Sequence, residues 1–214
     1  MLFRSLLFVD SSIGQMVNEL ASQGLDSSTE IIITAKHGQS PINHDLLVRL
    51  DEGTIPGILA AAGIAVAQQT ADDSSLLWLA DQSQTTAAVA ALQQSVANGN
   101  PAHIAQILAG KALTKQYGDP VADPRVPDII VQPQVGVIYS TSLKKLAEHG
   151  GGASDDTNVA LLLVKPGNSG PRQVQAPVTT TQVAPTILDY LGLNKHALQA
   201  VQQEHTQPLP ASQS

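Results

Sequence analysis

A run of β-branched residues, Ile31-Ile32-Ile33-Thr34, constrains the fold of this chain more than any other feature. Ser and Asp residues lie before the run, and Lys36-His37-Gly38 follows it. A short apolar run bounded in this way is typical of a buried strand. We therefore predict a strand over residues 30–35. Ligands of open α/β sheets bind beyond the carboxyl ends of strands, which directs attention to the loop that contains His37.

Helical patterns alternate with further apolar strands along the chain. Apolar residues recur at steps of three and four from Leu2 to Leu20, which predicts an amphipathic helix over residues 2–24. The same reasoning predicts helices over 54–62, 85–97, 102–108 and 181–191, and strands over 64–67, 75–80, 128–131, 135–139 and 158–164. This alternation favours an α/β fold, with at least the strands at 30 and 158 in a covered, largely parallel sheet.

Composition narrows the classes of function. The 214 residues fit one α/β domain, and the residues from 199 onward form a polar tail that we expect to be frayed. The net charge is −7 and Lys and Arg do not cluster, which argues against a nucleic-acid-binding surface. The absence of cysteine excludes disulfides and thiolate metal sites. The N-terminal apolar run, Leu6 to Val9, is too short for a signal peptide or a membrane span.

Two histidines are the candidate site residues. His37 follows a predicted buried strand, and His149 precedes three consecutive glycines that would let the backbone approach a ligand. Each could be a metal ligand or an acid/base, and each could equally be a strand cap or a loop residue without a site. Asp155 and Asp156 follow the glycines and are read as turn residues, with approach to a metal as the alternative.

Four segments in register resemble the type I phosphodiesterase / nucleotide pyrophosphatase family, within the alkaline-phosphatase superfamily. Residues 9–20 resemble the helix before its metal-binding strand, and 29–41 resemble the strand that ends in Asp-His-Gly. Residues 148–163, which begin Glu-His-Gly-Gly, resemble its late metal-ligand histidine and the strand behind it. Residues 178–193 are similar to the closing helix of the superfamily. Together these segments span most of the chain.

The resemblance implies a mostly parallel alkaline-phosphatase-like sheet flanked by helices, over residues 1–198, with its N-terminal strands missing. Residues 44–123 would be an inserted or cap segment. It implies one or two divalent ions, zinc above all, with His37 on one ion and His149 on the other. Two ions about 4 Å apart, each about 2.1 Å from its imidazole, place the rings roughly 5–9 Å apart. The implied activity is hydrolysis of phosphate esters or of nucleotide pyrophosphate bonds in a small-molecule substrate.

The sequence departs from the family pattern in two respects. Lys36 stands where a carboxylate ligand is expected, and its ammonium group suits a phosphate clamp or an altered metal site. The family's nucleophile and its other metal ligands belong to a region upstream of residue 1. We therefore expect the isolated chain to be inactive, and an upstream half or a second copy to cover the open sheet edge. Full-length relatives would be periplasmic or secreted.

Two alternatives stay open. One is a non-catalytic metal-binding or structural remnant. The other is a different hydrolase of the same superfamily, sulfatase-like or phosphoglycerate-mutase-like.

Overall fold

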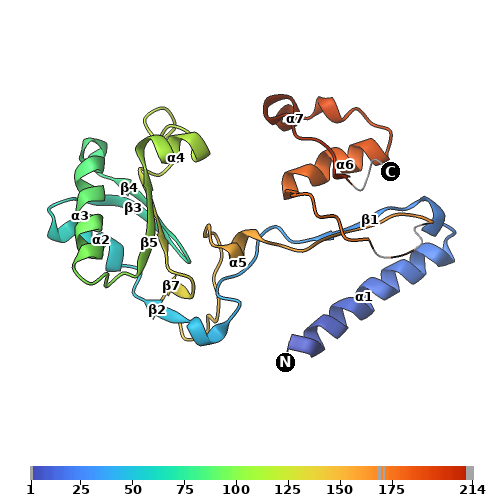
Figure 1. The fold of residues 1–214 in the computed structure, drawn as a ribbon, viewed down its shortest axis with the longest axis horizontal. Helices are drawn as coiled ribbons and strands as arrows, with labels where there is room; N and C mark the ends of the chain where they lie inside the picture. The colour runs from blue at the N-terminus through green and yellow to red at the C-terminus, as the bar shows by residue number, and fades with distance from the viewer. Residues whose placement is uncertain (1, 168–169, 171, 211–214) are drawn as a thin grey trace. The chain divides into compact units, whose positions relative to one another are not determined.

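The computed structural model describes residues 2–167, 170 and 172–210, and the chain divides into two compact units. We call residues 1–36 with 160–214 the terminal unit and residues 37–159 the central unit. Figure 1 labels their helices and strands. The predicted inserted segment, 44–123, falls inside the central unit, and its role as an insertion stays a prediction.

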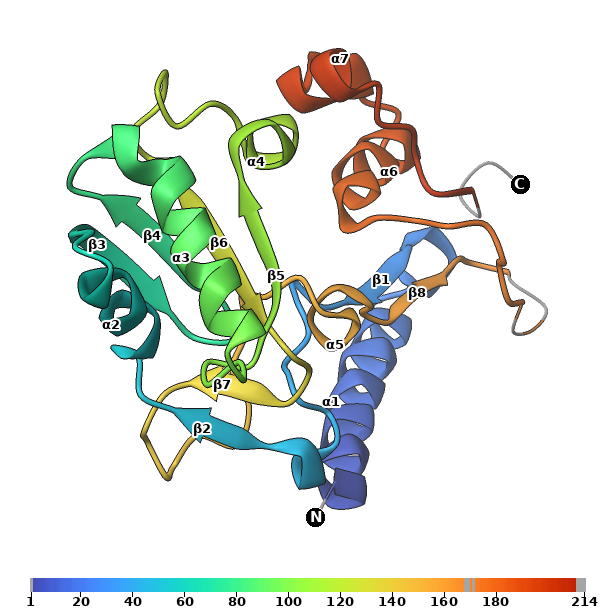
Figure 2. The same cartoon turned by 60° about the vertical axis from the view of Figure 1, so that its left-hand side comes forward.

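A four-stranded antiparallel sheet forms the centre of the central unit (Figure 2). Its strands run in the order β3, β4, β6, β5, with these bounds: β3 Val66–Ala71, β4 Ser75–Leu79, β6 Ile129–Pro133 and β5 Ile104–Ala109. Alternating side chains of these strands point to opposite faces, so each face can bury its own set of apolar residues.

Helices cover both faces of this sheet. The helices α2 (Thr54–Ala61) and α3 (Thr85–Ala97) bury Leu59 and Leu92 against Leu77 in the main core. The helix α4 (Gly110–Tyr117) packs Leu113 against Ile130 in a smaller cluster. Ile129 and Val131, the neighbours of Ile130 in β6, belong to the main core, so the two clusters lie on opposite faces of the sheet. A sheet covered in this way provides a rigid base for the turns at its ends.

A second, parallel pair of strands adjoins the core. The strand β2 (Val48–Leu50) pairs with β7 (Val137–Tyr139). Tyr139 is fully buried, and its hydroxyl donates a hydrogen bond of 3.0 Å to the carbonyl oxygen of Ala102. Burial raises the pKa of Tyr139 above its ordinary value, so the hydroxyl remains a donor at neutral pH. Its backbone N–H donates to the Asp72 carbonyl at 2.7 Å, which ties β7 to the turn between β3 and β4.

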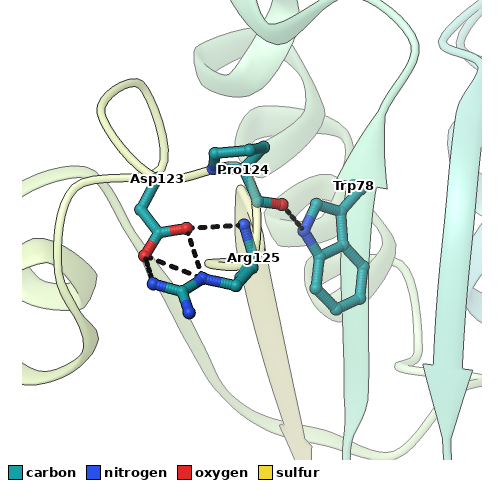
Figure 3. Close-up of polar contacts among 4 residues, drawn as sticks. All are labelled: Trp78, Asp123, Pro124 and Arg125. Carbon is teal, nitrogen blue, oxygen red and sulfur yellow. Dashed lines mark hydrogen bonds and ion pairs between the residues drawn. The ribbon is translucent and has the colours of Figure 1, made fainter.

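The loop before β6 is fastened to β4 by one side chain (Figure 3). The indole N–H of Trp78 donates to the carbonyl oxygen of Pro124 at 3.0 Å. Beside it, the guanidinium of Arg125 donates three hydrogen bonds, of 2.7, 2.9 and 3.2 Å, to the carboxylate of Asp123. These bonds lower the pKa of Asp123 to about 2, although the pair is solvent-exposed and contributes little to stability.

The described residues of the terminal unit form two strands and the helices near both ends of the chain. The helix α1 is Leu2–Ser22, and β1 (Ile31–Thr34) pairs antiparallel with β8 (Leu161–Val164). The helices α6 (Val183–Tyr190) and α7 (Gln199–Glu204) follow. No helix among the described residues has the length and hydropathy needed to cross a bilayer.

The expected frayed tail is ordered as far as it is described. Val201 in α7 and Leu209 beyond it are 5% and 2% exposed. The backbone N–H of Leu209 donates to the hydroxyl of Thr186 in α6 at 2.8 Å. The stretch is polar overall, but the apolar side chains of Val201 and Leu209 are buried. The prediction of a frayed tail was therefore wrong up to Pro210. Residues 211–214 lie outside the described residues.

Two predictions about strands are corrected. Residues 102–108, expected as a helix, overlap β5 (Ile104–Ala109), in which pairing with β6 overrides the helix preference of its Ala, Gln and Leu residues. The register shift between Ile104 and Gln106 breaks the alternation by which a strand would be recognised. The strands at 30 and 158, expected to be parallel, pair antiparallel and are half-buried. An apolar run indicates burial and gives no strand direction. The mixed α/β class itself is confirmed.

Candidate functional site

His37 and His149 lie in direct contact within the central unit. Their ring centroids are 4.3 Å apart and the rings are inclined by 23°, which is a stacked arrangement. The expectation that both histidines share one site requires a separation below about 15 Å, and the observed value meets it. The separation is shorter than the 5–9 Å expected for rings on two ions. A metal would therefore bind at the ring edges and not between the faces.

Backbone pairing between two distant segments brings the histidines together. Ser40 and Glu148 exchange two backbone hydrogen bonds of 2.9 Å as an isolated antiparallel bridge. The N–H of Gly38 donates to the Asp156 carbonyl at 2.7 Å. These bonds join the loop after His37 to the segment on either side of His149. A side chain at Gly38 would collide with the carbonyl of Asp155, so glycine permits this close approach.

The local contacts of His37 suit a metal ligand. Its Nδ1 lies 2.8 Å from the carbonyl oxygen of Gly38. Because a carbonyl can only accept, Nδ1 carries the hydrogen, and the neutral ring then presents the lone pair of Nε2. A backbone carbonyl that fixes the tautomer in this way is a common partner of metal-bound histidine. His37 is half-buried and His149 is exposed, so the pair is open to solvent.

The histidines alone do not complete a metal site. In the described part of the chain, no group of three or more His, Asp or Glu side chains is placed to hold an ion. Catalytic zinc takes three protein ligands and keeps a fourth position for water or substrate. The donor type thus fits zinc, and the number of donors falls short. The metal role of His37 and His149 stays a prediction, as does the phosphate or altered-metal role of Lys36, whose side chain is exposed.

A charged network surrounds the residue before His149. Glu148 is buried and forms an ion pair with Lys145, which also lies 3.8 Å from Asp72. Burial raises the pKa of Asp72, the charge of Glu148 raises it further, and the Lys145 ammonium opposes both. The hydrogen bond to Glu148 raises the pKa of Lys145. Lys145 therefore carries a positive charge that holds the two carboxylates together beside His149.

Gln132 holds the glycine loop that follows His149. Its side-chain oxygen accepts from the N–H of Gly152 at 2.6 Å, and its amide donates to the Asp73 carbonyl at 3.1 Å. The hydroxyl of Ser74 donates to the carbonyl of Gly150 at 3.3 Å. These three bonds fix the loop to the turn between β3 and β4. Sequence reasoning missed Gln132 and Ser74, because their contacts depend on pairing between distant strands.

We expect Gln132→Ala to lower the free energy of unfolding of the central unit by about 1–2 kcal/mol, since it removes two hydrogen bonds. Urea unfolding followed by the fluorescence of Trp78, the chain's single tryptophan, measures this effect. Hydrogen exchange at the Gly152 amide should accelerate at the same time. Gln134→Ala is the matched control, because Gln134 is exposed and should change stability by less than about 0.5 kcal/mol. Equal effects of the two substitutions would contradict the bridging role.

Comparisons with known proteins concern the family and the fold of the chain. The profile of the type I phosphodiesterase / nucleotide pyrophosphatase family matches residues 2–155. The fold is similar to the structure of human ectonucleotide pyrophosphatase / phosphodiesterase 5, with a TM-score of 0.57 and 15% sequence identity. The alignment covers 87% of this chain and 46% of that one, so this chain spans about half of the length of that protein. No curated protein sequence matches the chain.

Proposed function

The chain belongs to the type I phosphodiesterase / nucleotide pyrophosphatase family, and from this premise we propose that it takes part in metal-dependent hydrolysis of phosphate esters or nucleotide pyrophosphate bonds. The observation that carries the proposal is the contact between His37 and His149, with ring centroids 4.3 Å apart. Two solvent-accessible imidazoles side by side are suited to binding a divalent ion of the zinc type, which neutral imidazole nitrogen favours.

Three residues would contribute to the site in different ways. His37 would bind through Nε2, held in place by the bond from its Nδ1–H to the Gly38 carbonyl. His149 would bind from the loop that Gln132 and Ser74 fix in position. A bound zinc would supply Lewis-acid polarisation of a phosphoryl oxygen and lower the pKa of a bound water. Lys36 would contribute a positive point charge toward a phosphate.

Because these histidines supply two ligands, we propose that further ligands and the nucleophile come from an upstream half or a second copy of the chain. The exposed apolar side chains of the terminal unit support a partner. They lie on α1 and β8 and include Phe3, Leu6, Leu7, Phe8, Val9, Met16, Val17, Leu162 and Val164. The isolated 214-residue chain would then bind zinc without turning over substrate.

Zinc binding and hydrolysis together test this proposal. Equilibrium dialysis of the full chain should detect zinc, and His37→Ala or His149→Ala should lower its affinity by at least about tenfold. The control is His44→Ala, because His44 is an exposed histidine elsewhere in the central unit. Hydrolysis of bis-p-nitrophenyl phosphate by the chain alone should be undetectable with zinc or manganese.

Three other results would decide against parts of the proposal. Zinc binding that neither histidine substitution weakens would remove the metal role of the pair. Turnover by the isolated chain that His149→Ala abolishes would show that the site is self-sufficient. Preferential hydrolysis of p-nitrophenyl sulfate would instead favour the sulfatase-like alternative.

A further inference from the structure

Two buried aspartates meet beneath the glycine loop that follows His149. Asp73 lies in the turn between β3 and β4, and Asp156 lies in the short helix α5 (Ser154–Thr157). A methyl group at Gly151 would lie 2.8 Å from Oδ2 of Asp156 and 3.1 Å from Cγ of Asp73. Both carboxyl groups therefore flank the same point of the backbone. A side chain at residue 151 would crowd both carboxyl groups and the Asp73 carbonyl.

Neither carboxyl group has a cationic partner in the described structure. Asp73 is 1% exposed and Asp156 is 3% exposed. All four of their carboxylate oxygens are buried, and none has a hydrogen-bond partner of regular geometry among the described residues. The ion pairs of Lys145, Arg125 and Lys195 are made with other acidic residues. Burying an uncompensated carboxylate costs several kcal/mol, and two adjacent ones also repel each other.

A shared proton would relieve only part of this cost. Burial raises the pKa of Asp73 above its ordinary value, the adjacent Asp156 carboxyl raises it further, and the nearby backbone N–H groups of Asp73 and Gly151 oppose the rise. Asp73 in its protonated form could donate one hydrogen bond to Asp156. A carboxyl group carries one proton, so the other oxygens of the pair would still lack a donor. A cation can interact with oxygens of both carboxylates at once.

We propose that Asp73 and Asp156 bind a hard divalent cation, calcium or magnesium, beneath the Gly150–Gly152 loop. Such ions take oxygen ligands, and magnesium is often held by one or two carboxylates with water completing its shell. Two aspartates with additional carbonyl or water oxygens meet that requirement, which is why a cluster of three acidic side chains is unnecessary. This site uses none of the nitrogen ligands of the histidine pair.

The cation would connect parts of the central unit that are far apart in sequence. It would join the turn after β3 to α5, with the glycine loop held between them. Gln132 and Ser74 already fix that loop to the same turn. The bound ion would therefore stabilise the position of His149 without contacting substrate, and it would do so whether or not the histidines bind zinc.

Titration of the full chain with calcium or magnesium tests the proposal. After chelator treatment, isothermal titration calorimetry should detect one site, and a saturating concentration of either ion should raise Tm by roughly 5 °C. Asp73→Asn and Asp156→Asn should each abolish the binding and the shift in Tm. These substitutions keep the side-chain shape, and either one suffices if the other does not fold. Asp123→Asn is the control, because Asp123 pairs with Arg125 at the surface.

The outcomes separate this site from the histidine pair. The double substitution His37→Ala with His149→Ala should leave calcium binding unchanged, even if it abolishes zinc binding. The proposal is overturned if neither ion changes Tm at about 10 mM, a concentration far above the Kd of intracellular calcium sites. It is also overturned if Asp73→Asn responds to calcium as the wild type does. If Asp73→Asn had a higher Tm than the wild type and neither ion changed the Tm of the wild type, the two aspartates would share a proton and would not bind a cation.

Discussion

Tyr139→Ala should lower the free energy of unfolding of the central unit by about 3–5 kcal/mol, as expected for removing a large aromatic side chain from a core. Tyr139 is fully buried and packs in the main cluster with Ile129, Val131 and Leu77. The substitution would leave a cavity, and it would leave the Ala102 carbonyl without the hydroxyl that now donates to it at 3.0 Å. Urea unfolding monitored by Trp78 fluorescence measures the loss.

Two controls divide this effect into its causes. Tyr139→Phe keeps the ring and removes only the hydrogen bond, so it should cost about 1 kcal/mol. Tyr117→Ala removes a tyrosine ring that is 49% exposed on α4, and it should cost less than about 1 kcal/mol. A loss from Tyr139→Ala no larger than that from Tyr139→Phe would show that the ring does not fill the core as described.

Periodicity predicted those elements in which one local pattern persists. The predicted helix over 85–97 matches α3, Thr85–Ala97, and the helix over 2–24 matches α1, Leu2–Ser22, apart from its last two residues. The apolar runs at 75–80 and 128–131 contain or overlap β4 and β6. In each case several turns or successive residues repeat the same preference, so no tertiary contact is needed to decide between helix and strand.

Periodicity did not predict the elements that depend on pairing with distant segments. β5 has a bulge and helix-favouring residues, and it becomes a strand because β6 pairs along it. β2 has only three residues, Val48–Leu50, and exists through its parallel pairing with β7. The helix α4, Gly110–Tyr117, has only eight residues and one fully buried apolar side chain, Leu113. Short elements carry too few residues for a reliable pattern.

The candidate site was predicted only in part, again because it depends on contacts between distant segments. The residues alone gave His37 and His149 as separate candidates, and only the family resemblance joined them. The bridge between Ser40 and Glu148 that brings them together is a backbone contact, and a backbone contact leaves no signature in side-chain type. Asp73 was not considered, and Asp156 was read chiefly as a turn residue. Both are ordinary turn residues in sequence, and burial alone distinguishes them.

Gly38→Ala should have the largest effect near the candidate site, with a loss of about 3 kcal/mol or more in the free energy of unfolding of the central unit. The added methyl group would collide with the Asp155 carbonyl oxygen and would lie 2.9 Å from the carbonyl carbon and 3.1 Å from Cα of Asp156. Backbone atoms cannot rotate away as a flexible side chain can. The segment must shift instead, at a cost of the size expected for severe overpacking.

That shift would also reach the histidine pair. The N–H of Gly38 donates to the Asp156 carbonyl at 2.7 Å, and the Gly38 carbonyl accepts from Nδ1 of His37 at 2.8 Å. Moving Gly38 therefore weakens the contact with α5, and its carbonyl would no longer fix the tautomer of His37. We expect Gly38→Ala to lose stability and, if the histidines bind zinc, to bind it at least about tenfold more weakly, because partners that orient a ligand contribute that much.

A second glycine substitution provides the matched control for Gly38→Ala. Gly57 lies within α2, and a methyl group there would have no neighbour within 4 Å. Gly57→Ala should therefore raise the stability of the central unit by up to about 1 kcal/mol, because alanine is the better helix former. Chemical denaturation of both variants distinguishes steric collision from a general effect of adding a methyl group. If Gly38→Ala unfolded at the same denaturant concentration as the wild type, the close approach of residues 38 and 155 would not exist in solution. The backbone explanation for the stacked histidines would then fail with it.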